Sequence, residues 1–324
     1  MRIVGFILFM IMFANTLDDL IFDIEVQIHE GKFEDTNVQR KLEENTNYMT
    51  LILNRDYKFT INKKSIIEKV IINNEEIDNL EQEIKVKEGS EIQIHFNTPL
   101  SNCSNFFKDI NETIKSAIVS VDLSNFDSSN LEDTSLMFYK CSSLKSINFL
   151  NFNTAKVKNM EWMFWQCSSL EEVDLSNLDT SKVTNMRYLL SDCSSLKKAN
   201  LSKLNAYNVK NMKRLFSDCS SLKEVDFSKI NTSNLIDMSY LFFECSSLKE
   251  VDLSSFDTSH VKFMDSLFFK CSSLEKVNLS NFNTSSVKLM SDLFYKCTSL
   301  EKVDLSNFNT SDESILDSLF FDCS

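Results

Sequence analysis

Cysteine recurs at a fixed interval through most of this chain, and the interval limits the fold more than any other feature. Eight cysteines lie 26 residues apart, and nearly the same segment recurs between them, as in CSSLEKVNLSNFNTSSVKLMSDLFYKC from Cys271 to Cys297. A period of this size is typical of solenoids, in which each repeat packs only against its neighbours. The sequence therefore predicts one long, thin core made of stacked units.

The apolar residues of one unit follow two rhythms. Val277 and Leu279 flank Asn278 with the two-residue alternation of a strand. Further on, the apolar positions lie three and four residues apart, which predicts one face of a short helix with Thr284 or Ser285 as its N-cap; these positions are Val287, Met290, Leu293, Phe294 and Cys297. Because parallel strands need a crossover, we expect an α/β fold, a right-handed solenoid of eight strand-turn-helix units.

The repeat pattern CSSLxxVDLSxFxTSxVxxMxxLFxxC resembles that of BspA-like leucine-rich-repeat surface proteins, and the resemblance covers residues 118–324. It implies a solenoid like that of leucine-rich repeats, secretion or display at the cell surface, and adhesion or other protein binding. The implied partner is a protein ligand, with a host or matrix protein as one candidate.

Two segments precede the repeats. Residues 1–16 have the order of a signal peptide, because a basic start at Arg2 is followed by an apolar run over residues 3–13; the alternative is a buried first element. Residues 17–117 are predicted to form a small β-rich domain and a degenerate half-repeat that cap the solenoid. Its expected hairpins join residues 48–53 to 57–61 and residues 66–72 to Ile77, with further strands at 84–86 and 92–96.

The cysteines are predicted to form a structural ladder of buried, free thiols. Their equal spacing places one at the same position of each unit, too far from its neighbours for a disulfide; they are Cys141, Cys167, Cys193, Cys219, Cys245, Cys271, Cys297 and Cys323. Cys103 lies outside the ladder and is expected to be exposed or paired. No metal site is expected, because the chain has no CxxC pair and its three histidines are not in ligand spacing with a cysteine.

Two surfaces are candidates for binding. The first is the outward strand face, whose polar ladder consists of Asn148, Asp174, Asn200, Asp226, Asp252, Asn278 and Asp304. The alternative is that this face contacts only solvent and binds no partner. The second is a position on the predicted helix, where we favour packing between neighbouring helices over exposure. Its residues are Tyr139, Trp165, Ser191, Ser217, Phe243, Phe269, Tyr295 and Phe321.

Charge and motifs restrict the function. The net charge of −13 argues against nucleic acid and anionic membranes as partners. We expect no enzyme, no cofactor and no transmembrane anchor, since the chain lacks catalytic motifs and a second long apolar run. We therefore expect a secreted or cell-surface protein that binds other proteins. The alternatives are a self-assembling surface element that oligomerises through its uncapped last unit, and an intracellular repeat scaffold.

Overall fold

The computed structural model describes residues 47–61, 64–107, 114–309 and 317–323. The chain divides into two compact units, Met1–Asn45 and Thr46–Ser324, and all described residues lie in the second unit. The predicted signal peptide, residues 1–16, and the start of the predicted β-rich domain therefore fall outside the described residues.

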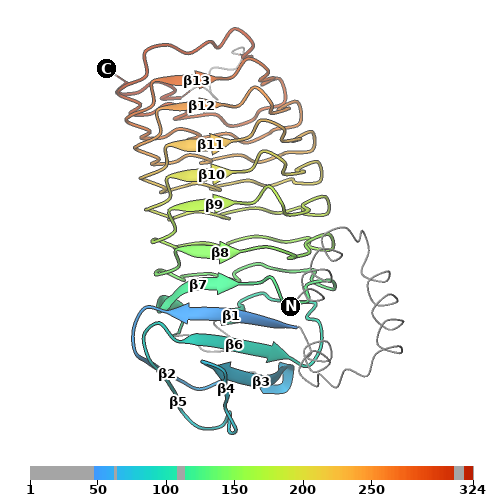
Figure 1. Ribbon diagram of the computed structural model, residues 1–324. Coiled ribbons are helices and arrows are strands. Elements are labelled where there is room, and N and C mark those ends of the chain that lie inside the picture. The colour runs from blue at the N-terminus through green and yellow to red at the C-terminus, as the bar shows by residue number, and fades with distance from the viewer. Residues whose placement is uncertain (1–46, 62–63, 108–113, 310–316, 324) are drawn as a thin grey trace, which may run out of the picture. The chain divides into compact units, whose positions relative to one another are not determined.

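An antiparallel sheet occupies the first part of the second unit (Figure 1). Its strands are β1 (Tyr48–Leu53), β3 (Ile67–Ile72), β4 (Glu75–Glu76) and β6 (Glu91–Phe96), in the order β4-β3-β6-β1. Strands β2 (Tyr57–Phe59) and β5 (Ile84–Val86) pair separately, and η1 (Lys64–Ile66) and η2 (Ile114–Ser116) are short 3-10 helices.

Of the two predicted hairpins, one is confirmed and one is wrong. Strands β3 and β4 pair across Asn73 and Asn74, whose φ angles of 50° and 70° suit a tight hairpin turn. Strands β1 and β2 do not pair with each other, because β1 lies between β6 and β7 (Ile118–Asp122) instead. Since Leu51 is opposite Val121 in that pairing, the antiparallel sheet runs without a break into the first repeat and covers its edge.

The repeats stack as a solenoid whose strands are parallel and in register (Figure 1). We call each 26-residue repeat a coil. After β7, the strands are β8 (Ser146–Asn148), β9 (Glu172–Asp174), β10 (Lys198–Asn200), β11 (Glu224–Asp226), β12 (Glu250–Asp252) and β13 (Lys276–Asn278). A second parallel ladder of single bridges connects the coils at Asn102, Asp133, Asn159, Asn185, Asn211, Asp237, Phe263 and Leu289.

The predicted strand-turn-helix unit is wrong. From residue 118 to residue 309, the segment after each strand consists of turns and the second ladder, with no helix. The fold is therefore a β-solenoid and not the α/β solenoid of leucine-rich-repeat type that the apolar spacing and the resemblance indicated.

Backbone hydrogen bonds explain how these turns replace a helix. The N–H groups of Trp162 and Phe164 donate to carbonyls of the next coil, at 3.0 and 2.9 Å. The N–H groups of Trp165 and Cys167 donate instead to carbonyls three residues earlier in their own coil, both at 3.1 Å. Successive β-turns thus return an apolar side chain to the core about every third residue, which is the spacing that mimics a helix.

The turns require a left-handed backbone at two positions in each coil. Non-glycine residues occupy these positions with φ between 52° and 63°, although glycine is the residue that adopts this conformation without steric cost. They are Leu136, Lys140, Trp162, Gln166, Tyr188, Asp192, Arg214, Asp218, Tyr240, Glu244, Ser266, Lys270, Asp292, Lys296, Ser318 and Asp322.

The core of the coils is continuous and includes the cysteine ladder. The cysteines are free, and those from Cys141 to Cys297 are buried, while Cys323 is partly exposed. Each thiol from Cys167 onward donates to a carbonyl 29 residues earlier, at 2.8 to 3.2 Å. Cys103, which we expected to be exposed or paired, is buried and forms no disulfide, so this prediction is wrong.

The strand ladder is interrupted twice, each time after a phenylalanine. Where the last inward residue of a strand segment is Leu123, Leu175, Leu201 or Leu253, its N–H donates to the next coil at 3.0 Å. At Phe149 and Phe227, no such bond forms among the described residues, and the sheet breaks between β8 and β9 and between β11 and β12. The N–H of Leu279, at the equivalent position beside the last coil, forms no such bond to a described residue either, so a phenylalanine accompanies both breaks in the sheet but is not the sole condition for losing the bond.

Candidate binding surface

The polar ladder of the strand face has a structural role in every coil. Each Asp or Asn accepts, through Oδ1, a hydrogen bond from the backbone N–H two residues later, at 2.8 to 3.1 Å. This Asx turn ends the strand and starts the following turn. The backbone N–H of Ser306 accordingly lowers the pKa of the Asp304 carboxyl. Asn148, Asp174, Asp226, Asp252, Asn278 and Asp304 are exposed, and Asn200 is partly exposed.

The charged residues beside this ladder pair with each other from coil to coil. Lys197 contacts Glu171 at 2.6 Å, and Lys198 contacts Glu224 at 3.0 Å. The same arrangement recurs further along, where Lys276 contacts Glu250 at 2.6 Å. Exposed pairs of this kind stabilise the fold little, but they leave fewer unpaired charges on the strand face for a ligand.

Aromatic side chains gather on a different side of the coils, where the turns lie. Tyr139 stacks on Trp165 with ring centroids 4.9 Å apart, and Trp162 stacks on Tyr188 at 4.1 Å. Trp162 also meets Trp165 edge to face at 5.3 Å, which joins the two columns. The side chains are partly exposed, so they both pack against one another and face solvent.

Arginine continues the column where a ring is missing. The guanidinium of Arg214 lies 4.4 Å from the ring centroid of Tyr240, 5.2 Å from that of Phe243 and 5.9 Å from that of Tyr188. Arg187 lies over Tyr188 at 5.1 Å. These contacts connect one surface, which we call the aromatic face: Tyr139, Trp162, Trp165, Arg187, Tyr188, Arg214, Tyr240 and Phe243.

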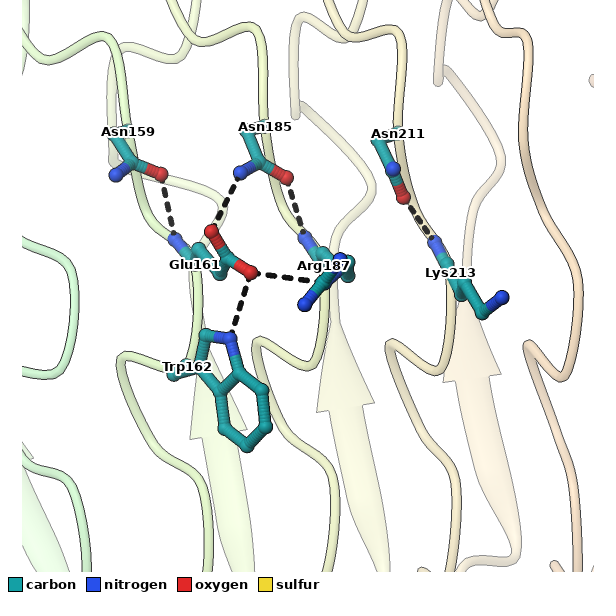
Figure 2. Close-up of polar contacts among 7 residues, drawn as sticks. All are labelled: Asn159, Glu161, Trp162, Asn185, Arg187, Asn211 and Lys213. Atoms are coloured by element: carbon teal, nitrogen blue, oxygen red, sulfur yellow. Dashed lines mark hydrogen bonds and ion pairs between the residues drawn. The ribbon is translucent and has the colours of Figure 1, made fainter.

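A polar cluster fixes the most aromatic part of this face (Figure 2). Glu161 accepts a hydrogen bond of 2.7 Å from the indole N–H of Trp162 and one of 2.9 Å from the side-chain amide of Asn185. It also forms an ion pair with Arg187 in the next coil, at 2.9 Å. The carboxylate therefore holds a tryptophan of one coil and an arginine of the next in fixed orientations.

Asparagines support the same cluster from the second ladder. Asn159, Asn185 and Asn211 each accept, through Oδ1, from the backbone N–H two residues later, at 3.1, 3.1 and 2.9 Å (Figure 2). The repeated Asx turn places Glu161, Arg187 and Lys213 at equivalent positions of consecutive coils. A rigid backbone thus presents the aromatic face.

The composition of this face is that of a protein interface. It holds both tryptophans of the chain and both arginines of residues 118–324. Trp, Tyr and Arg are enriched among the residues that dominate binding energy at protein interfaces. Trp and Tyr bury a large area and lose little conformational entropy, and Arg offers several hydrogen-bond donors in one plane. This composition is suited to contacting a protein surface.

The sequence located only one column of the face. Tyr139, Trp165 and Phe243 belong to the predicted aromatic position, and they do stack on their neighbours, although on turns and not on helices. We did not predict the second column, because in a helix its side chains would point away from those of the first column. It consists of Trp162, Tyr188, Arg214 and Tyr240. Its members lie 26 residues apart, and this period is the signal that could have revealed it.

Comparison with known proteins identifies the repeats. Residues 101–226 and 210–324 match the family described as Mycoplasma protein of unknown function, DUF285. The chain belongs to this family. No curated protein and no solved structure matches it.

The description of the DUF285 family states no function. Among the described residues of this family member, no helix has the length and apolar composition that crossing a bilayer requires.

Proposed function

We propose that this protein is a non-catalytic binding protein, secreted or displayed at the cell surface, whose aromatic face contacts a protein partner. The concentration of Trp, Tyr and Arg on one rigid side of the coils is the observation that carries this proposal. The resemblance of the repeat to BspA-like surface proteins supports a location outside the cell. The aromatic face is a stronger candidate than the strand face, whose Asp and Asn oxygens accept from their own backbone.

Site-specific photo-crosslinking tests the aromatic face. A photoreactive phenylalanine analogue replaces Trp165 in the full chain, and a matched variant carries it at Tyr207, which is 51% exposed and lies outside the face. We expect a discrete protein adduct on cells of the source organism from position 165 and none from position 207. The adduct should disappear when Tyr188→Ala and Arg214→Ala are added.

The outcomes separate the alternatives. Equal adducts from both positions, or none from position 165, would contradict a binding role for this face. An adduct with a second copy of the chain would favour self-assembly over binding of a different protein. Circular dichroism and thermal unfolding of each variant check that the solenoid is intact.

Protease treatment of intact cells tests the location. We expect repeat peptides to be released, and the mature chain to begin near Asn15 or Leu17. Retention of all repeat peptides inside the cells, on a chain that still starts at Met1, would leave an intracellular scaffold as the better reading.

A further inference from the structure

A groove runs along the coils beside the aromatic face. It has a volume of about 530 Å³, and its walls are formed by the residues immediately before and after the ladder cysteines. The local backbone explains the hollow: Cys141 points into the core, and the N–H of Ser142 donates to the carbonyl of Lys140 at 2.8 Å, a tight turn around the cysteine. The equivalent residues of the next coils, Gln166, Ser168, Asp192 and Ser194, continue the groove.

Charge is separated along this groove. Lys115 and Lys140 line one end, Gln166 lies in the middle, and Asp192 and Asp218 line the other end. Lys115 is only 8% exposed, so this positive charge is held within the wall of the groove. Burial and the like charges of Asp192 and Glu244 raise the pKa of the Asp218 carboxyl, while the hydrogen bond from Ser217 and the charge of Arg214 act against this rise.

Elsewhere on the coils, charged side chains of opposite sign pair with each other. Lysines and glutamates of neighbouring coils form ion pairs on the strand face, and Glu244, the next residue of the same column, pairs with Lys270 at 2.7 Å. Among the described residues, Lys140, Asp192 and Asp218 form no ion pair within 4.0 Å. They have uncharged partners instead: Lys140 Nζ lies 5.3 and 5.4 Å from the ring centroids of Tyr139 and Trp165, and the carboxylates of Asp192 and Asp218 accept hydrogen bonds of 3.1 and 2.6 Å from Ser191 and Ser217. Because none of these partners carries an opposite charge, the groove keeps a positive end and a negative end.

The length of the groove indicates how many residues of an extended peptide it could hold. From Lys115 to Asp218 the groove crosses about four coil steps of roughly 4.8 Å, or about 19 Å in all. An extended peptide advances about 3.3 Å per residue, so about six residues span this length. Serines line the second wall: Ser116, Ser142, Ser168 and Ser194. The hydroxyl of Ser116 accepts from Arg55 at 2.9 Å, and that of Ser168 donates to the carbonyl of Ser142 at 3.2 Å.

We infer that the groove binds an extended peptide segment of about six residues with acidic side chains at one end and basic side chains at the other. The acidic end lies against Lys115 and Lys140, and the basic end lies against Asp192 and Asp218. The inference rests on the proposed protein-binding function and specifies which segment of a partner enters beside the aromatic face.

Fluorescence anisotropy with synthetic peptides tests this inference on the full chain. The probe is the labelled, end-capped peptide Glu-Glu-Ser-Ser-Arg-Arg, and the control is Glu-Arg-Ser-Ser-Glu-Arg, which has the same composition without the separation. We expect the first peptide to bind at least about fivefold more tightly, and its affinity to fall as salt is added. Equal affinities for the two peptides would overturn the inference.

A variant of one end provides the second measurement. Lys140→Glu makes the groove acidic along most of its length, so the separated peptide should bind at least about fivefold more weakly, while Arg-Arg-Ser-Ser-Arg-Arg should bind more tightly. Lys229→Glu changes the net charge equally at an exposed site outside the groove and should alter neither affinity. The same effect from both variants would also overturn the inference.

The two proposals fail separately. If Lys140→Glu leaves peptide affinity unchanged while the crosslink at position 165 persists, the groove is not the peptide site but the aromatic face still binds protein. If the crosslink is absent and the separated peptide binds selectively, the groove is a binding site and the aromatic face is not.

Discussion

Asp292 combines a strained backbone with unfavourable charge. Its φ is 55°, and burial together with the carboxylates of Asp317 and Asp265 raises the pKa of its side chain. Asp292→Gly should therefore stabilise the protein by about 1 kcal/mol at pH 7, since glycine removes the steric cost and the repulsion. A raised pKa in the folded state means that the electrostatic penalty develops as pH rises above about 4, so the gain should shrink toward pH 3. Urea unfolding at both pH values measures it.

Ser291→Gly is the matched control for this substitution. Its φ is not in the left-handed region, so glycine brings only a more flexible unfolded chain and should destabilise the protein by about 0.5 to 1 kcal/mol. A stabilising effect at both positions would mean that backbone strain at Asp292 is not the cause.

At the scale of elements, we expect the size of the side chain at position 149 to affect whether two strands pair. A recess of about 270 Å³ lies at the break between β8 and β9, lined by Ile147, Phe149, Leu150 and Val173 among others. Phe149→Leu should let the N–H at position 149 bond to the next coil, as the N–H of Leu175 does. Hydrogen exchange at this amide should then slow at least tenfold.

The reverse substitution completes the test. Leu175→Phe should open the ladder between β9 and β10, speed exchange at residue 175, and cost about 1 to 3 kcal/mol through overpacking. Unchanged exchange in both variants would show that side-chain size does not set the breaks.

These elements show why the sequence predicted the strands and missed the turns. The alternation of residues such as Val173 and Leu175 has only one regular structural explanation, so the strand positions from β7 to β13 were correct. The eighth predicted strand is only a single bridge at Lys302. A spacing of three, as between Met160 and Met163, arises from a helix and equally from a β-turn that links these two residues. Glycine would have signalled the left-handed positions, but Lys140 and Gln166 occupy two of them.

The candidate surfaces were predicted in part for the same reason. Any correct period aligns Tyr139 with Trp165, whatever the secondary structure between them. The guanidinium of Arg214 lies between the rings of Tyr188 and Tyr240 because of the direction in which the turn points each side chain. That direction cannot be predicted from the residue types alone. The Asx turns at Asp226 and Asp252 were not foreseen either, because an exposed carboxylate gives no sign of its backbone partner.

For the molecule as a whole, the cysteine ladder should set an alkaline limit to stability. Burial raises the pKa of the Cys193 thiol to about 12 and holds other ladder thiols well above 9. Because the thiols ionise near pH 9 only in the unfolded chain, their contribution is complete below pH 9. It is lost as pH rises from about 9 toward 12, at about 1.4 kcal/mol per thiol per pH unit.

Urea unfolding between pH 8 and pH 10.5 measures this slope. Cys193→Ala should reduce the slope of the unfolding free energy against pH by the contribution of one thiol. In a separate measurement, iodoacetamide at pH 8 should label Cys323 first, since this thiol is partly exposed. Stability that does not fall above pH 9 would contradict the assignment of these thiols to a buried, neutral state.

The direction of the hydrogen bonds between coils has a mechanical consequence. Both parallel ladders run along the stacking axis, so tension along that axis loads these bonds in line and separates one coil at a time. Each detached coil of 26 residues lengthens the chain by up to about 90 Å, against a rise of about 4.8 Å while it is stacked. We expect rupture to start where the strand bonds between β8 and β9 or between β11 and β12 are missing, and the protein to lengthen in steps.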